Sequence, residues 1–206
     1  MVRFTGKKNR LARRFGVNIF GKMRNPLLHK ANPPGMHGAR KRKKSDFGLQ
    51  LEEKQKLKAV YGMLTEKQLL RAYQAALKES GNTAQNFAVR LECRLDNIVY
   101  RLKLAPTIFA AQQLVSHGHI EVDGKCVDRR SFRVEPGMKV AVREKSRQMP
   151  LVRSALENGM RQVPDYLSSQ SDACSGELIV KPLIEQMPWP IEINLLEVCD
   201  FLAHFH

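Results

Sequence analysis

Arginine side chains recur at helical spacing in one segment of the sequence, where they could bind phosphate groups. Arg90, Arg94 and Arg101 fall within about 60° of one another on a helical wheel if residues 84–102 form one helix. Apolar residues with the same spacing mark the buried side of this helix: Leu91, Leu95, Ile98 and Leu102. We therefore expect the three guanidinium groups to face outward at the rim of the buried side and to reach phosphate.

A second set of residues that could contact an anion follows this helix. It surrounds an expected β-hairpin and consists of Ser116, His117, His119, Lys125, Arg129, Arg130 and Arg143. A single arginine is often a solvated charge, but the whole set forms an extended cationic surface. Such a surface suits folded RNA, which proteins recognise through phosphate and 2′-hydroxyl contacts spread over several elements. No recognition helix for duplex DNA stands out.

The strongest concentration of positive charge lies in the first 45 residues. They contain fourteen Lys and Arg and no Asp or Glu, in a chain of 206 residues with a formal net charge of +15. Mutual repulsion predicts an extended arm that becomes ordered on a polyanionic partner. The residues of the arm that we expect to bind RNA are Arg3, Lys7, Lys8, Arg10, Arg13, Arg14, His37, Arg40, Lys41, Arg42, Lys43 and Lys44.

Two other interpretations of this arm stay open, a solvated tail and a mitochondrial presequence. Phe4, Phe15 and Phe20 interleave the basic residues, and residues 33–38 form a turn-rich run. Neither alternative requires these features, so the RNA-binding arm is favoured.

An enzymatic function has little support in the sequence. It contains no hydrolase, zinc-protease or nucleotide-loop motif, and its four cysteines are far apart, so we expect no metal and no cofactor. The tripeptide RLD at 94–96 also occurs near the catalytic aspartate of pseudouridine synthases. Here it falls inside an amphipathic helix, so we expect Asp96 to hold a neighbouring basic side chain in place. No stretch suits a membrane span or a secretory signal. The widely spaced cysteines give neither a metal-binding pair nor a dense disulfide framework, which favours a reducing cytoplasm.

Local signals predict the elements that position these residues. A capping box of Thr65 and Gln68 begins a helix that ends before Gly81, and Thr107 caps a further helix through residue 116. Alternation then predicts strands over 120–127, with Asp123 and Gly124 in a tight turn. A further strand is expected over 138–142, a loop over 168–176 and a closing helix over 195–205.

Together these elements predict an α+β protein in three parts. Residues 1–45 form the basic extended arm, and residues 46–92 form a helical domain that about 180–206 completes. Residues 93–179 form an inserted RNA-binding domain of helices and a small antiparallel sheet.

Short runs in the central part resemble the S-four RNA-binding domain: RLDN at 94–97, QLVSH at 113–117, IEVDG at 120–124 and REKS at 143–146. That domain is shared by a ribosomal protein, pseudouridine synthases and a bacterial tyrosyl-tRNA synthetase. The flanking runs decide between them: PGMHGAR at 34–40, SDFGLQL at 45–51, EKQK at 53–56 and GN at 81–82. These runs are similar to the bacterial-type family of small-subunit ribosomal protein number four.

The resemblance implies a structural, non-enzymatic protein that binds 16S ribosomal RNA at a multi-helix junction and nucleates assembly of the small subunit. It also implies a monomer within the ribosome, with proteins five and twelve as partners in decoding accuracy and no membrane partner. Many members carry a four-cysteine zinc site near the start, whereas the first cysteine here is Cys93, as in the zinc-free branch. The alternative is a stand-alone or ribosome-associated factor with an S-four domain.

Overall fold

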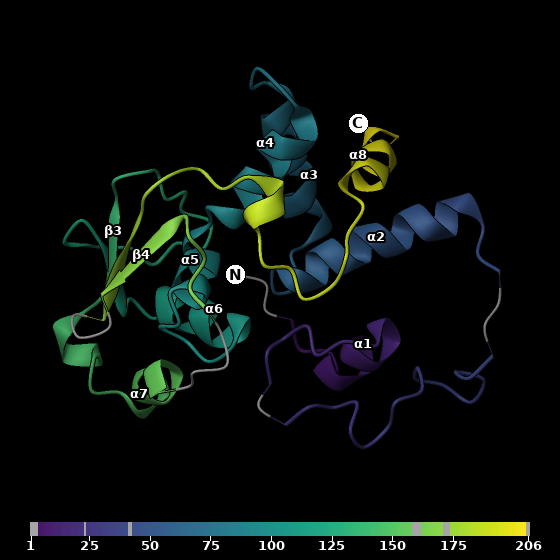
Figure 1. Cartoon of the computed structure of the whole chain (residues 1–206), viewed down its shortest axis with the longest axis horizontal. Helices are drawn as coiled ribbons and strands as arrows, with labels where there is room; N and C mark the ends of the chain where they lie inside the picture. Colours follow the sequence, from purple (N-terminus) through teal and green to yellow (C-terminus); the bar gives the residue numbers. More distant parts are fainter. Residues whose placement is uncertain (1–3, 23, 41–42, 158–161, 171–173, 205–206) are drawn as a thin grey trace. The chain divides into compact units, whose positions relative to one another are not determined.

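The computed structural model of the chain describes residues 4–22, 24–40, 43–157, 162–170 and 174–204 (Figure 1). The chain divides into two compact units, Met1–Ala84 with Trp189–His206, and Gln85–Pro188. The domain limits expected from the sequence stay a prediction, because these two units are defined by compactness and not by independent folding. Within the described ranges, no helix has the length and apolar character that crossing a membrane requires.

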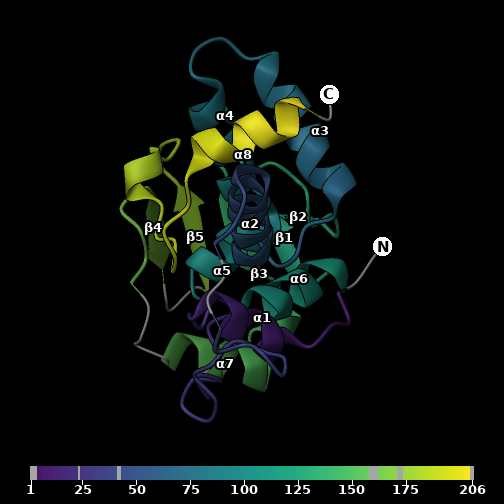
Figure 2. The same cartoon turned by 90° about the vertical axis from the view of Figure 1, so that its right-hand side faces the viewer.

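The first unit is built from helices, two of which pack against a closing C-terminal helix. The helices are α1 (Lys8–Phe15), α2 (Asp46–Val60), α3 (Glu66–Leu77) and α8 (Leu195–Ala203). α8 packs along α2 and also contacts α3 (Figure 2). The buried core of this unit includes Leu57, Leu69, Tyr73, Val198 and Phe201. The expected closing helix is therefore confirmed over Leu195–Ala203.

Side-chain caps fix where these helices begin. Thr65 and Gln68 form the predicted capping box at the start of α3. Ser45 accepts a hydrogen bond from the backbone of Gly48 at the start of α2, and Asn194 caps α8 in the same way. Such caps satisfy backbone N–H groups that the helix itself leaves without a partner.

The basic arm is not extended throughout, in contrast to the expectation. α1 forms two helical turns inside it, ends at Gly16 in the left-handed region, and buries Ala12. Ile19 and Phe20 are also buried. Charge repulsion does not prevent this packing, because arginines on the outer side of an amphipathic helix remain solvated while its apolar side packs.

The second unit combines helices with a five-stranded antiparallel sheet, which confirms the α+β class. α4 (Thr83–Glu92) begins at its boundary, and α5 (Leu95–Arg101), α6 (Ile108–Ser116) and α7 (Pro150–Glu157) follow, with short 3-10 turns over Glu144–Ser146 and Ile184–Gln186. The strands are β1 (Ile120–Val122), β2 (Lys125–Cys126), β3 (Lys139–Val142), β4 (Leu167–Gln170) and β5 (Ser175–Leu178). Their order is β2-β1-β3-β5-β4 (Figure 2).

The predicted hairpin is confirmed in its turn, and its return strand β2 ends at Cys126. Asp123 and Gly124 both have positive φ, 48° and 76°, as a type I′ turn requires. Val122 pairs with Lys125 across β1 and β2, and Thr107 caps α6 as expected.

The loop expected over 168–176 was wrong, because β4 and β5 occupy most of it and residues 171–173 lie outside the described residues. β4 buries only Leu167, and its next three residues are exposed on the sheet edge, which explains their polar composition. At Gly176, an added Cβ would lie 2.3 Å from Leu102 Cδ2. Glycine is therefore required by close packing here, although its sequence context resembles a loop.

The single helix expected over 84–102 was also wrong. α4 ends at Glu92 and α5 starts at Leu95, with Arg94 extended between them. The backbone N–H of Leu95 donates to the carbonyl of Phe132 at 2.8 Å, and that of Val134 donates to the carbonyl of Cys93 at 2.9 Å. A distant segment thus supplies the hydrogen bonds that a continuous helix would have made internally.

Candidate nucleic-acid interface

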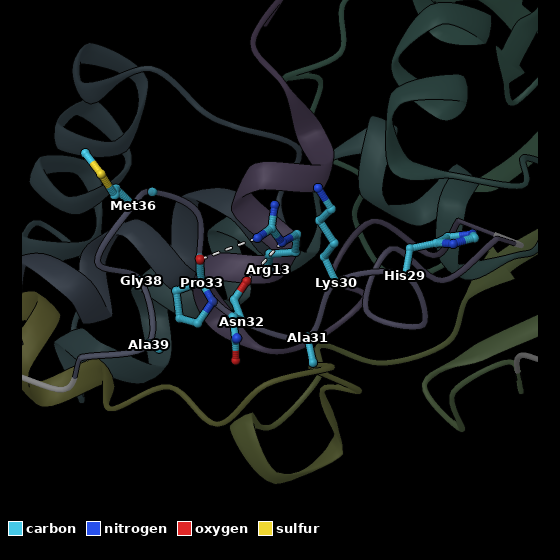
Figure 3. Close-up of a pocket in the computed structure, with 10 residues that line it drawn as sticks. Arg13, His29, Lys30, Ala31, Asn32, Pro33, Met36, Gly38 and Ala39 are labelled. Atoms are coloured by element: carbon cyan, nitrogen blue, oxygen red, sulfur yellow. Dashed lines mark hydrogen bonds between the residues drawn. The ribbon is translucent and has the colours of Figure 1, made fainter.

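A basic pocket lies in the arm between α1 and the loop that follows it. Its volume is about 490 Å³, and its lining consists of Arg13, His29, Lys30, Ala31, Asn32, Pro33, Gly35, Met36, Gly38 and Ala39 (Figure 3). Arg13 Nε donates to the carbonyl of Asn32 at 2.9 Å, and its Nη2 donates to that of Pro33. One guanidinium therefore joins the helix to the loop and forms part of the pocket wall.

Glycine makes the fold of this loop possible. An added Cβ on Gly38 would lie 2.1 Å from the carbonyl oxygen of Pro33. The backbone N–H of Gly38 donates to the carbonyl of Gly35, which has a φ of +114°. The turn-rich run noted in the sequence is thus a tight structured loop, because only glycine permits so close an approach of the two backbone segments.

Most of the arm residues predicted to bind RNA are exposed. Those exposed are Lys7, Arg10, Arg14, His37, Arg40, Lys43 and Lys44, whereas Lys8 and Arg13 are half-buried. Lys44 forms an ion pair with Glu52. Arg3, Lys41 and Arg42 lie outside the described residues.

Sequence reasoning missed other residues of the arm. Lys22 Nζ donates to Asn9 Oδ1 at 2.7 Å beside a second hollow of about 390 Å³, which Lys7, Lys8 and Arg10 also line. His29, Lys30 and Asn32 line the first pocket. His29, Lys30 and Asn32 precede the turn-rich run 33–38, and this was the only sequence feature that could have pointed to them. The reversal of the chain that brings them to Arg13 could not be predicted from residue spacing.

In the second unit, a cluster of predicted residues forms where α6 ends and β1 begins. Arg130 Nε donates to Ser116 Oγ, and His119 Nδ1 lies 2.9 Å from Ser146 Oγ. Arg143 Nη1 donates to the carbonyl of Gly118 at 3.2 Å. His117, Lys125, Arg129 and Arg143 are exposed, and Ser116, His119 and Arg130 are half-buried.

Arg90, Arg94 and Arg101 were expected to face outward, and two of these three arginines do not. Arg101 is buried and its Nε lies 2.6 Å from Glu92 Oε1. Only 11% of the Arg94 side chain is exposed, and its Nη2 lies 2.9 Å from Asp96 Oδ2. Asp96 therefore holds a neighbouring arginine, as expected. The third arginine, Arg90, is half-buried.

Burial and negative charge shift the titration of groups around Glu92. Burial, and then the neighbouring Glu92 carboxylate, raises the pKa of Cys93 to about 11. The same two causes raise the pKa of Tyr166 far above its ordinary value, and its hydroxyl donates to Glu92 Oε1 at 2.8 Å. The Tyr166 hydroxyl and the Cys93 thiol therefore stay neutral, and Arg101 is the charged partner of Glu92. This network has a structural role.

Among the described residues, no three His, Cys, Asp or Glu side chains are grouped so that they could hold a metal ion. The zinc-free arm stays a prediction.

Comparison with known proteins identifies the family of this chain. Residues 3–92 match the family described as ribosomal protein S4/S9 N-terminal domain, and residues 93–140 match the S4 domain. The chain is 69% identical over 204 residues to the small ribosomal subunit protein uS4 of Protochlamydia amoebophila, with 99% of each chain covered. The chain belongs to the ribosomal protein S4 family. It is also 58% and 55% identical, over 207 residues, to the proteins of that name from Chlamydia muridarum and Chlamydia pneumoniae, again with 99% of each chain covered.

Membership of the ribosomal protein S4 family confirms the resemblance inferred from the short runs. The matched S4 domain begins at Cys93, at the break between α4 and α5, and contains Ser116, His119 and Arg130 of the cluster at the end of α6, whereas Arg143 and Ser146 follow it. A ribosomal protein S4 is a structural protein and not an enzyme.

Proposed function

We propose that this chain is a structural protein of the small ribosomal subunit that binds 16S ribosomal RNA directly. The observation that carries the proposal is the 69% identity, over 99% of both chains, to a protein named for that subunit. The charge distribution supports it, because no carboxylate precedes Asp46 and most basic side chains of the arm are exposed. Phosphate contacts provide most of the affinity of such surfaces.

Two surfaces make the RNA contacts in this proposal. The first is the arm, with its exposed basic residues and the pocket beside Arg13. The second is the cluster in the second unit around Ser116, His119 and Arg143. Arg94 and Arg101 are left out, because their guanidinium groups already bind buried carboxylates.

The finer parts of the proposal concern the protein's place in the ribosome. It binds early, at a multi-helix junction, and nucleates assembly of the subunit. Ribosomal proteins five and twelve are its neighbours in decoding accuracy, and its location is the cytoplasm.

Sedimentation of small subunits through high salt tests the proposal. A core component stays with the subunit after the wash, because many simultaneous RNA contacts hold it. Recovery of the protein only in the wash fraction would indicate a ribosome-associated factor instead. Filter binding of the purified protein to 16S ribosomal RNA then tests direct contact.

A further inference from the structure

Ser116, the last residue of α6, makes two hydrogen bonds whose directions follow from the chemistry of a hydroxyl. Its Oγ donates to the carbonyl of Gln112 at 2.8 Å, which uses the one hydrogen that a hydroxyl has. The same oxygen is the acceptor for Arg130, whose Nε donates to it. An arginine of the loop after β2 is thus attached to the end of a helix 14 residues earlier in the sequence.

The backbone of Arg130 is fixed as well. Its carbonyl accepts from the backbone N–H of Asp96 at 3.3 Å, and the carbonyl of Phe132 accepts from the N–H of Leu95 at 2.8 Å. These bonds join the loop to the start of α5. The protein itself therefore holds both the backbone and the side chain of Arg130.

Both attachments of Arg130 lead to one buried residue, Asp96, which is 1% exposed. Gln112 accepts from Ser116 with its carbonyl and donates from its side chain to Asp96 Oδ2 at 3.3 Å. Arg94 binds the same carboxylate through two of its nitrogens. The orientation of Arg130 thus depends on a network anchored in the core of the second unit.

A guanidinium carries five N–H donors in a rigid planar fork, so a fixed Nε also fixes the directions of the other donors. An arginine that is oriented before binding loses less side-chain entropy when it binds a phosphate group. Arg129 and Arg143 are exposed and bring further positive charge to the same cluster. Phosphate groups of RNA are the anions that such a cluster binds under the proposed function.

We propose that Ser116 is a positioning residue for RNA binding, which orients the guanidinium of Arg130 and does not itself contact RNA. The inference rests on the proposed function and adds to it the separate roles of two residues in one cluster. Arg130 binds the phosphate group, and Ser116 acts only through Arg130.

A double-mutant cycle with the full-length protein and 16S ribosomal RNA tests the inference. Ser116→Ala should weaken RNA binding about two- to tenfold, the effect of having to immobilise one more side chain. The slope of log K against log salt should stay unchanged, because no charge is removed. Arg130→Met should weaken binding and make the slope shallower by about 0.7–0.9. In the Arg130→Met background, Ser116→Ala should have no further effect, because the residue on which it acts is absent.

Two further variants separate positioning from damage to the fold. Ser154→Ala is the matched control, since Ser154 Oγ on α7 makes a bond of the same kind to the carbonyl of Leu151 at 3.1 Å. It should leave RNA binding unchanged. Arg130→Lys keeps Ser116, its bond to the helix and the positive charge, but has no Nε. It should weaken RNA binding as Ser116→Ala does, again with an unchanged slope. Thermal melting of each variant shows that it is folded.

Three results would overturn the positioning role. One is an equal loss of affinity on Ser116→Ala with and without Arg130, which would mean that Ser116 contacts RNA itself or supports the fold alone. The others are unchanged RNA binding by Ser116→Ala and unchanged RNA binding by Arg130→Lys. Each of these leaves RNA binding by the wild-type protein intact, whereas failure of the proposed function removes RNA binding itself.

Discussion

Arg101 and Glu92 form a buried ion pair across the break between α4 and α5, with 2.6 Å between Nε and Oε1. Arg101 also donates from Nη1 to the carbonyl of Pro188, and Tyr166 donates to the same carboxylate oxygen of Glu92. Three segments that are distant in the sequence therefore meet at one charged pair inside the second unit.

Arg101→Met should strongly destabilise the second unit. It leaves the Glu92 carboxylate buried without its cation, which costs about 3–5 kcal/mol. Thermal and urea unfolding measure the decrease in stability, and Arg71→Met on the exposed side of α3 is the control. An unchanged melting temperature would show that the pair contributes nothing.

Arg94→Ala should also lower stability, by about 1–3 kcal/mol, because buried Asp96 loses its bidentate partner. Gln112 at 3.3 Å and the N–H of Asn97 continue to bind Asp96, so the protein should still fold. Melting and filter binding on one preparation check this. Normal stability with weakened RNA binding would instead make Arg94 an RNA contact.

Replacing Lys7, Arg10 and Arg14 together by Ala should weaken binding to 16S ribosomal RNA and leave the melting temperature unchanged. The slope of log K against log salt should become shallower by about 0.7–0.9 for each phosphate that the variant no longer neutralises. The matched control removes three exposed cations from α3 and its C-terminal end, Lys67, Arg71 and Lys78. If both triple variants change the slope equally, binding depends on net charge and not on the arm.

Gly176→Ala should destabilise β5 by about 1–3 kcal/mol, as overpacking does. The new Cβ would lie 2.3 Å from Leu102 Cδ2 and 2.5 Å from the carbonyl oxygen of Ser168. Gly48→Ala in α2 provides the contrast and should destabilise less, because its nearest atom is Ser45 Oγ at 3.3 Å and a helix interior favours alanine over glycine. Urea unfolding compares the two, and equal midpoints would mean that close packing at Gly176 is not what requires glycine.

Stability should decrease as the pH rises from about 9 to about 11. Burial raises the pKa of Cys93 from its ordinary value of 9.0 to about 11, so the unfolded chain loses this proton first. The stabilisation is complete below pH 9 and is lost as the pH rises through the pKa of the folded state. Cys93→Ala should make the decrease shallower in urea titrations, with exposed Cys126→Ala as the control. Identical slopes for the two variants would exclude Cys93 as the cause.

Signals between neighbouring residues allowed much of the fold to be predicted. Thr65 with Gln68, Thr107 and the pair Asp123 and Gly124 each act on the backbone within a few residues. The elements that they begin or join could therefore be placed without knowledge of tertiary packing. The family resemblance, which comparison confirmed, rested on equally short runs.

The errors arose where a distant segment decides the local structure. The helix break at Arg94 depends on hydrogen bonds with residues near Phe132, and β5 depends on its pairing with β3. Arg101 was assigned to the surface because its partner, Glu92, faces it only when that break exists. The pocket beside Arg13 was missed for the same reason, since its loop reverses direction.

The first unit is formed by two segments of the chain, which the second unit separates in the sequence. This arrangement imposes an order on its folding during synthesis. α2 and α3 leave the ribosome early, but α8, against which they pack, is made only after the whole second unit. All of Gln85–Pro188 is translated before residues 195–203. Until α8 is made, the faces of α2 and α3 that pack against it lack that partner, so these helices stay accessible to chaperones and proteases while the second unit is translated.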